Sequence, residues 1–391
     1  MNPTPPDPQA RPWLGTPRAA YVHVPFCVHR CGYCNFTVAT GREDLIGSYL
    51  LAIGRELAAS IEPRSVRSIY LGGGTPTHLS ASQLGQLLAQ VVQWLPLAED
   101  EDNEFSAEAN PADVDAARLD ALARFGVNRL SLGVQSFDDE KLRRLERDHR
   151  AADITRSVAM ARQRFASVSL DLIFACPGES LSGWSADLRR AIDLGPDHVS
   201  IYGLTFERGT LFWNRRRRGD LHEVDEDTQA AMYAAAIDAL TAAGYEHYEV
   251  SNFARPGHRC RHNQVYWAGQ PYYAVGPGAA RYVDGRRETN HRSTTTYLRR
   301  VLAGQSPTAE SETLSPEDRA REALVLGLRR IDGVECPAFA RQFGYAIDAL
   351  AGDAIGRFCD LGFLHHDGNH LRLTRRGLFV SDGLWSELLR A

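Results

Sequence analysis

Short apolar segments alternate with longer segments of helical period along most of the chain. Ala20–Val24 is an apolar run of strand length, whereas Asp44–Ile61 places its apolar side chains on one helical face. The same patterns predict strands over 66–71, 105–109, 129–133, 168–174 and 198–204, and helices over 80–94, 113–125, 138–145, 151–164, 183–194 and 228–243. Ser80 and Gln83 have the spacing of a capping box, which predicts the start of one of these helices.

Six successive β–α repeats predict a parallel sheet with helices on its outside. Right-handed crossovers curl such a sheet towards a barrel, and six units are too few for a complete eight-stranded one. We therefore expect an α/β protein with a partial (β/α)6 TIM-like barrel over residues 20–302. An open, doubly wound sheet is the alternative fold.

The two ends of the chain have other patterns. Segment 1–19 is rich in proline and is expected to be a disordered arm, and the polar segment 303–314 is expected to be a linker. Beyond it, helical segments from Ser315 precede a hairpin turn at 367–369. This order predicts a small C-terminal α+β domain of winged-helix-like form over 315–391.

Charge and hydropathy exclude some classes of partner. The formal net charge of −5 gives no basic footprint, so we expect no nucleic-acid partner. No apolar stretch approaches the ~18 residues of a membrane span, so any membrane association would be peripheral. The N-terminal segment lacks a signal-peptide core, and the protein is expected to be cytoplasmic. Its seven cysteines are therefore interpreted as metal ligands, reactive thiols or core residues.

Three cysteines with the spacing C-x3-C-x2-C follow the first predicted strand: Cys27, Cys31 and Cys34. One tight loop can direct three thiolates to one iron–sulfur cluster, and a [4Fe-4S] cluster needs four protein ligands for saturation. Asn35 and Phe36 follow instead of a fourth cysteine, which leaves one iron open for an external ligand. The alternative is a zinc site in which His29 or His23 is the fourth ligand.

Polar or glycine-rich residues also follow the other predicted strands, or lie near their ends: Gly73, Gly74, Thr75, Glu108, Gln135, Arg147 and Asp171. The carboxyl ends of parallel strands form one face of a barrel, so we expect these residues to lie together. Glycines let the backbone approach a ligand closely. Carboxylates suit ribose hydroxyls, and an arginine or amide suits a carboxylate. Taken singly, each residue could instead have only a structural partner.

Five segments resemble those of the coproporphyrinogen III dehydrogenase-like group of the radical S-adenosylmethionine (SAM) superfamily: YVHVPFCVHRCGYCNF, LGGGTPT, AEANP, RLSLGVQSF and LDLIFACPG. The resemblance covers nearly the whole chain after the N-terminal arm, including a HemN-like C-terminal domain. It implies a [4Fe-4S] cluster on the three cysteines with SAM at the open iron. It also implies SAM contacts from Tyr21, Tyr33, Gly73, Gly74, Thr75, Glu108, Gln135, Arg147 and Asp171.

Two subgroups of this family differ in function. The dehydrogenases carry a further cysteine where this sequence has Phe36, and a longer region before the first cysteine. The other subgroup, HemW, is described as a haem chaperone without dehydrogenase activity, and it carries a haem-binding motif H-N-x-x-Y-W. This sequence reproduces the motif with His262, Asn263, Tyr266 and Trp267. An imidazole is a good axial ligand for haem, aromatic rings can stack on a porphyrin, and Cys260 could supply a second ligand or a thioether link.

The sequence departs from the family in two loops. The usual Gly-Leu-Pro after the fifth strand reads Ala175-Cys176-Pro177, and the usual Gly-Pro-Gly-Ala-His loop ends in Ala280 instead of histidine. Neither change removes a cluster ligand.

The resemblance implies a haem-binding chaperone that delivers haem to an unidentified acceptor protein. Its cluster and SAM would regulate transfer or the formation of a homodimer, or support slow radical chemistry. The alternative is a radical SAM enzyme that modifies a tetrapyrrole, either coproporphyrinogen III or haem itself, although the missing cysteine argues against the dehydrogenase reaction. A structural protein that only carries a cluster is disfavoured by the complete set of SAM residues.

Overall fold

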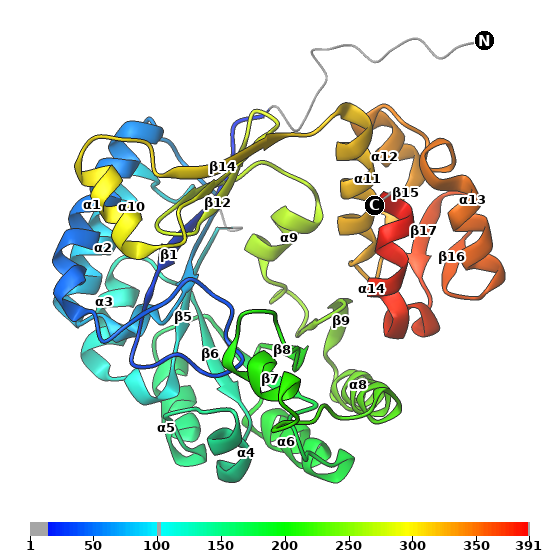
Figure 1. The fold of residues 1–391 in the computed structure, drawn as a ribbon, viewed down its shortest axis with the longest axis horizontal. Coiled ribbons are helices and arrows are strands. Elements are labelled where there is room, and N and C mark those ends of the chain that lie inside the picture. Colours follow the sequence, from blue (N-terminus) through cyan, green and yellow to red (C-terminus); the bar gives the residue numbers. More distant parts are fainter. Residues whose placement is uncertain (1–14, 100–102, 390–391) are drawn as a thin grey trace.

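The computed structural model describes residues 15–99 and 103–389, and its largest unit is a nine-stranded sheet (Figure 1). The strand order is β11-β1-β4-β5-β6-β7-β8-β10-β9. Its six central strands are parallel: β1 (Ala19–Val24), β4 (Ser68–Gly73), β5 (Glu104–Ala109), β6 (Arg129–Gln135), β7 (Ser167–Phe174) and β8 (His198–Gly203). Three shorter strands complete its edges: β9 (Glu246–Glu249), β10 (Asn252–Ala254) and β11 (Tyr273–Val275). Most of the predicted N-terminal arm, residues 1–14, lies outside the described residues.

The helices between these strands follow the predicted order: α1 (Ile46–Ser60), α2 (Ala81–Trp94), α3 (Ala116–Arg124), α4 (Asp139–Arg144), α5 (Ala151–Arg162), α6 (Leu181–Leu194) and α8 (Glu226–Ala242). The capping box of α2 is confirmed, since the Gln83 amide donates to the Ser80 hydroxyl and the Ser80 amide donates to Gln83. The six parallel strands lie in sequence order, without the reversal that defines a doubly wound sheet. The predicted partial barrel is therefore confirmed, and the alternative fold is not.

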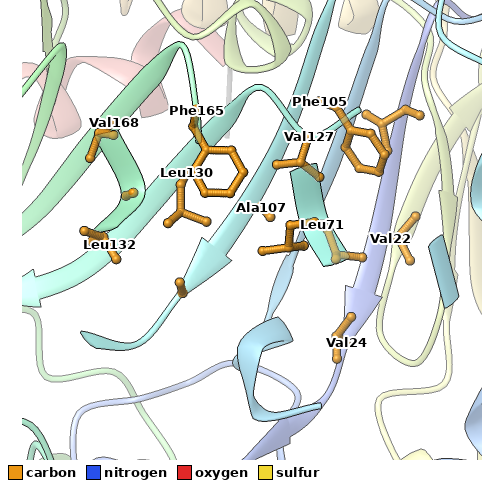
Figure 2. Close-up of a cluster of buried hydrophobic side chains, with 14 of the residues drawn as sticks. Val22, Val24, Leu71, Phe105, Ala107, Val127, Leu130, Leu132, Phe165 and Val168 are labelled. Carbon is orange, nitrogen blue, oxygen red and sulfur yellow. The ribbon is translucent and has the colours of Figure 1, made fainter. Parts of the chain in front are cut away.

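The apolar core lies between the sheet and these helices. Figure 2 shows part of it, with side chains such as Val22, Leu71, Phe105 and Leu130 from four successive strands. Because side chains alternate along a strand, the residues between them point to the opposite face, the inside of the barrel. Those residues are largely polar: Tyr21, Tyr70, Glu108, Ser131, Asp171 and Ser200. The barrel therefore has an apolar outer layer and a polar interior.

Several elements were not predicted from the pattern: β2 (Phe26–Cys27), β3 (Ala39–Thr40), α7 (Leu211–Arg217), α9 (Arg261–Trp267), β12 (Ala280–Val283), β13 (Arg286–Asn290), α10 (Thr294–Leu302) and β14 (Thr308–Thr313). Strands β12, β13 and β14 form a separate antiparallel sheet. The segment 303–314 was expected to be an irregular linker, but it contains β14. This strand is polar because it lies at the edge of its sheet and is largely exposed.

The C-terminal domain has the predicted order of helices followed by a hairpin: α11 (Pro316–Leu328), β15 (Val334–Glu335), α12 (Cys336–Phe343), α13 (Ile347–Asp360), β16 (Leu364–His366), β17 (His370–Leu373) and α14 (Arg375–Leu389). Its core is separate from that of the barrel. The Asp367 carboxylate accepts the amides of Asn369 and His370 in the turn, as expected for an Asx turn. No helix of the described residues is long and apolar enough to cross a bilayer.

A buried ion cluster holds α4 against the barrel. Lys141, the single lysine of the chain, donates to Glu179 (2.5 Å) and Asp187 (3.1 Å), and all three side chains are at most 5% exposed. Asp187 also accepts the Ser136 hydroxyl and the Phe137 amide just after β6. This cluster fixes the segment that leads from β6 through α4 towards the candidate site.

Replacement of Lys141 by methionine tests this role. Lys141→Met removes the cation that pairs with the buried carboxylates of Glu179 and Asp187, so we expect a loss of about 3–5 kcal/mol in the free energy of unfolding. Urea denaturation measures it. The exposed neighbour Arg143 is the matched control, because Arg143→Met should change the stability by no more than about 0.5 kcal/mol. Equal stabilities of the two variants would contradict the structural role of the cluster.

Candidate functional site

The loop that carries the three cysteines follows β1 directly. Strand β2 includes Cys27 and pairs with β3, which closes the loop at its base. Within the loop, the guanidinium of Arg30 donates to the carbonyl oxygens of Cys34 (3.2 Å) and Phe36 (3.0 Å), and the Cys34 amide donates to Cys31 (3.0 Å). These contacts fix a short loop around the predicted ligands.

The thiols lie in a partly buried environment. Cys27 Sγ is 3.3 Å from the Thr75 hydroxyl, and Arg147 donates to Cys31 Sγ at 3.7 Å. Burial raises the pKa of the Cys27 thiol to about 12 and also raises that of Cys34, so binding of a metal group must displace their protons.

Among the described residues, no three His, Cys, Asp or Glu side chains are placed to hold one metal ion. Each cysteine of a [4Fe-4S] cluster binds a different iron, so the sulfurs need not meet at one point.

The loop lies at the edge of a cavity of about 460 Å³. This volume is within the range of small-molecule sites. Eight of the nine residues predicted to contact SAM line the cavity: Tyr33, Gly73, Gly74, Thr75, Glu108, Gln135, Arg147 and Asp171. Tyr21 does not line it, because its ring stacks on Tyr70 and its hydroxyl is 2.9 Å from His23 Nδ1. The fold thus brings together residues from six different segments of the chain.

Two half-buried carboxyl groups lie in this cavity. Glu108 accepts the Gly73 amide (2.9 Å) and the Tyr70 hydroxyl (3.0 Å), and Asp171 accepts the Ser131 hydroxyl (3.0 and 3.1 Å). Burial raises the pKa of Glu108 to about 7, although the bonds from Gly73 and Tyr70 oppose the shift. Burial also raises the pKa of Asp171. These groups can accept hydrogen bonds from hydroxyl groups of a ligand.

Arg147 and Gln135 are the polar groups nearest the end of β6. Arg147 donates to the Gly133 carbonyl (3.1 Å) and to Asn110 (3.3 Å), but its Nε is buried and has no hydrogen-bond partner among the described residues. Such an orphan donor indicates a missing partner, and an anionic group of a ligand would supply one. Gln135 follows an irregularity in the pairing with β7 and has φ of 65°, in the left-handed region. Uncommon backbone geometry of this kind is frequent at functional sites.

Several cavity residues were missed from the sequence: Tyr70, Arg129, Ser131, Ser169, His198 and Ser200. They lie at the starts or in the middle of strands, whereas the prediction considered only strand ends. The alternation of apolar and polar residues in β6, β7 and β8 was the available signal, because it identifies an inward polar face.

The H-N-x-x-Y-W motif lies on α9, at the opposite end of the barrel from the cysteines. Helix α9 packs against β4 and α11 and lies between the barrel and the C-terminal domain (Figure 1). The backbone amides of Arg261 and His262 donate to Glu104, the first residue of β5, whose side chain also accepts from Cys260 Sγ. The cysteine loop follows the last residue of β1. The two candidate sites are therefore separated by the length of the strands.

His262 is not accessible as an axial ligand in this arrangement. Its side chain is buried, and the residue is 1% exposed. Nδ1 is 3.1 Å from the Ser68 hydroxyl and Nε2 is 2.8 Å from the Tyr266 hydroxyl, so both ring nitrogens have partners. Burial lowers the pKa of His262 to about 4, which keeps the imidazole neutral.

The other motif residues have different surroundings. Asn263 and Cys260 line the 460 Å³ cavity at the end opposite the cysteine loop. Tyr266 lines a second cavity of about 260 Å³. The guanidinium of Arg329 lies over the ring of Trp267 at 4.6 Å, and the indole Nε1 has no hydrogen-bond partner among the described residues. The motif thus contacts two cavities rather than one.

Comparison with known proteins gives two matching families. Residues 21–191 match the radical SAM superfamily, and residues 314–380 match the HemN C-terminal domain. The structure superposes on coproporphyrinogen III oxidase (HemN) of Escherichia coli with a TM-score of 0.84 over 97% of this chain and 92% of that one. The sequences are 22% identical, so this likeness shows the fold alone.

Sequence relatives extend over nearly the full length. The chain is 33% identical to "Heme chaperone HemW" of Bacillus subtilis over 95% of its length and 99% of that protein. It is 39% identical to the protein of the same name from Escherichia coli, over 93% of this chain and 96% of that protein. The corresponding protein of Mycobacterium tuberculosis is 36% identical over 98% and 97%. On this similarity the chain belongs to the HemW family of the radical SAM superfamily.

Proposed function

We propose that this protein is a haem chaperone that carries a [4Fe-4S] cluster with SAM bound beside it and delivers haem to an acceptor protein. The observation that carries the proposal is the similarity to HemW proteins over nearly the full length of both chains. The cysteine loop, the polar cavity and the complete H-N-x-x-Y-W motif support it. A homodimer is the assembly we propose.

In this proposal, Cys27, Cys31 and Cys34 would hold the cluster, and the cavity beside them would hold SAM. Arg147 lies between the loop and β6, where its unpartnered Nε would donate to an anionic group. The backbone of Gly73 and Gly74 gives SAM a close approach. A Cβ at Gly74 would lie 2.8 Å from backbone atoms of Val24, Pro25 and Phe26, so this glycine also allows the cysteine loop to pack on β4.

Removal of a cluster ligand provides the first test. Anaerobic reconstitution of the full chain should give about four irons per chain, and Cys27→Ala, Cys31→Ala or Cys34→Ala should each abolish the cluster. Cys359→Ala is the control, since Cys359 lies in the C-terminal domain and should leave the iron content unchanged. Iron analysis and the visible spectrum measure the cluster content of the ligand variants and of the control. Stoichiometric zinc without iron uptake would contradict the cluster.

A charge change in the cavity tests the SAM site. Asp171→Asn keeps the size of the side chain but removes a charge that would accept ligand hydroxyls, so SAM affinity should fall about tenfold or more. The iron content should stay the same, because the Asp171 carboxylate bonds to Ser131 on the neighbouring strand, away from the cysteine loop. Asp193→Asn on the exposed part of α6 is the control. Unchanged SAM affinity in Asp171→Asn, measured by calorimetry, would place SAM elsewhere.

The haem function itself is tested with ferric haem and a tetrapyrrole substrate. The reconstituted protein should bind about one haem per chain at micromolar concentration or below, by axial ligation and apolar burial. With coproporphyrinogen III, SAM and a reductant, it should form no protoporphyrinogen IX. Efficient formation of that product would replace the chaperone proposal by the enzyme alternative.

A further inference from the structure

The end of the cysteine loop is held from outside the barrel by an arginine that belongs to none of the sequence motifs. Arg292 lies two residues beyond β13, and its guanidinium donates to the carbonyl oxygen of Asn35 and to the Thr37 hydroxyl (3.3 Å). Asn35 directly follows Cys34, the last of the three predicted cluster ligands. The arginine therefore contacts the loop one residue beyond a ligand, although Arg292 and Asn35 are 257 positions apart in the sequence.

The backbone that carries Arg292 is fixed by its own hydrogen bonds. The side chain of Asn290 donates to the buried carboxylate of Glu56 (2.6 Å), and the Gly278 amide donates to the carbonyl of His291 (3.0 Å). An exposed arginine contributes little through a single flexible contact. Here a fixed backbone and two acceptors on the loop define where the guanidinium lies.

The turn that contains Gly276 and Gly278 fits closely against both ends of the cysteine loop. A Cβ at Gly278 would overlap the Thr37 hydroxyl, and a Cβ at Gly276 would lie 2.5 Å from the carbonyl oxygen of His23. His23 precedes the three cysteines in the sequence, and Thr37 follows them. The segment that carries Arg292 is therefore packed on the base of the loop, which keeps the arginine and the loop in a constant relation.

The peptide bond between Asn35 and Phe36 joins this contact to a predicted cluster ligand. Its carbonyl oxygen accepts from Arg292, and its N–H, the Phe36 amide, donates to the sulfur of Cys34. Burial raises the pKa of the Cys34 thiol, and this hydrogen bond opposes the rise. The peptide is trans, so its oxygen and its hydrogen point in opposite directions and can bridge a guanidinium and a sulfur. Arg30 donates instead to the carbonyls of Cys34 and Phe36, which belong to the peptides before and after this one.

We propose that Arg292 is a positioning residue that raises the reduction potential of the cluster, by polarising the peptide whose amide donates to the Cys34 sulfur. The inference rests on the proposed cluster site at Cys27, Cys31 and Cys34. A cation on the carbonyl oxygen of a peptide strengthens the hydrogen bond that its N–H donates. Hydrogen bonds to the sulfurs are among the factors that set the potential of an iron–sulfur cluster. Because reduction adds negative charge to the cluster, a stronger N–H···S bond favours the reduced form.

Two variants and a control test the inference in the reconstituted full chain. Arg292→Met removes the charge and the donors, so the midpoint potential of the cluster, measured by redox titration with EPR detection, should shift to a more negative value. Arg292→Lys keeps the charge but loses the planar fork of donors, so it should shift the potential in the same direction by a smaller amount. Arg299→Met is the matched control, since Arg299 is exposed on α10 and carries the same charge, and it should leave the potential unchanged.

A second measurement follows the hydrogen bond itself. In protein labelled with ¹⁵N-phenylalanine, pulsed EPR of the reduced cluster should detect a weak coupling to the Phe36 nitrogen. Phe36→Leu removes the label from this position and should abolish the coupling, which assigns it. Arg292→Met should weaken the coupling, whereas a role of Arg292 limited to its charge acting through space would leave it unchanged.

Three results would overturn the inference. They are a wild-type cluster without coupling to Phe36, equal potentials of wild type and Arg292→Met, and a wild-type potential in Arg292→Lys, because the charge alone would then suffice. The wild-type coupling decides the question even if Arg292→Met loses its cluster. A wild-type chain that takes up no iron would overturn the proposed cluster site, and this inference with it.

Discussion

The polar interior of the barrel is the constraint on which the rest of the structure depends. Carboxyl and guanidinium groups such as Glu108, Asp171 and Arg147 lie at low exposure, and a buried charge is costly unless it is hydrogen-bonded or paired. Hydroxyl groups, glycine amides and backbone carbonyls in the interior form most of the hydrogen bonds that these charged groups require. The outer face of the same strands must then supply the core, which explains their alternation. Two segments enclose this interior, the cysteine loop at one end and α9 at the other.

Much of the barrel could be predicted because one physical signal defines it. The outer faces of the six strands and the inner faces of the helices are apolar with different periods, so both types of element are visible in the sequence. Short or exposed elements lack that signal. Strands β10 and β11 have three residues each, too few for a period, and β14 is polar because it lies at a sheet edge. Helix α9 has seven residues and owes its place to Glu104, far away in sequence.

The residues of the candidate site likewise fall into two groups, those that have a local sequence signal and those that do not. The cysteine spacing is local, and strand ends converge in any parallel barrel, so Cys27 to Cys34 and the glycine loop could be placed from the sequence. Tyr21 could not, because only the packing shows that Tyr70 separates it from the cavity. The interior residues Arg129 and His198 were missed for a related reason. They begin their strands, and their role depends on the depth of the cavity, which no local pattern contains.

The haem motif shows what residue spacing leaves undecided. His262 and Tyr266 are four positions apart on α9, so the helix brings imidazole and hydroxyl together on one face. The spacing cannot show that His262 is buried whereas Tyr266 lines the second cavity, because this depends on packing against β4 and α11. Tyr70 extends the pair further. Its ring lies 5.2 Å from that of His262, and its hydroxyl donates to Glu108 in the other cavity. Three adjacent side chains, Tyr70, His262 and Tyr266, therefore lie between the cavity at the cysteine loop and the second cavity, and only the packing of α9 on β4 brings them together.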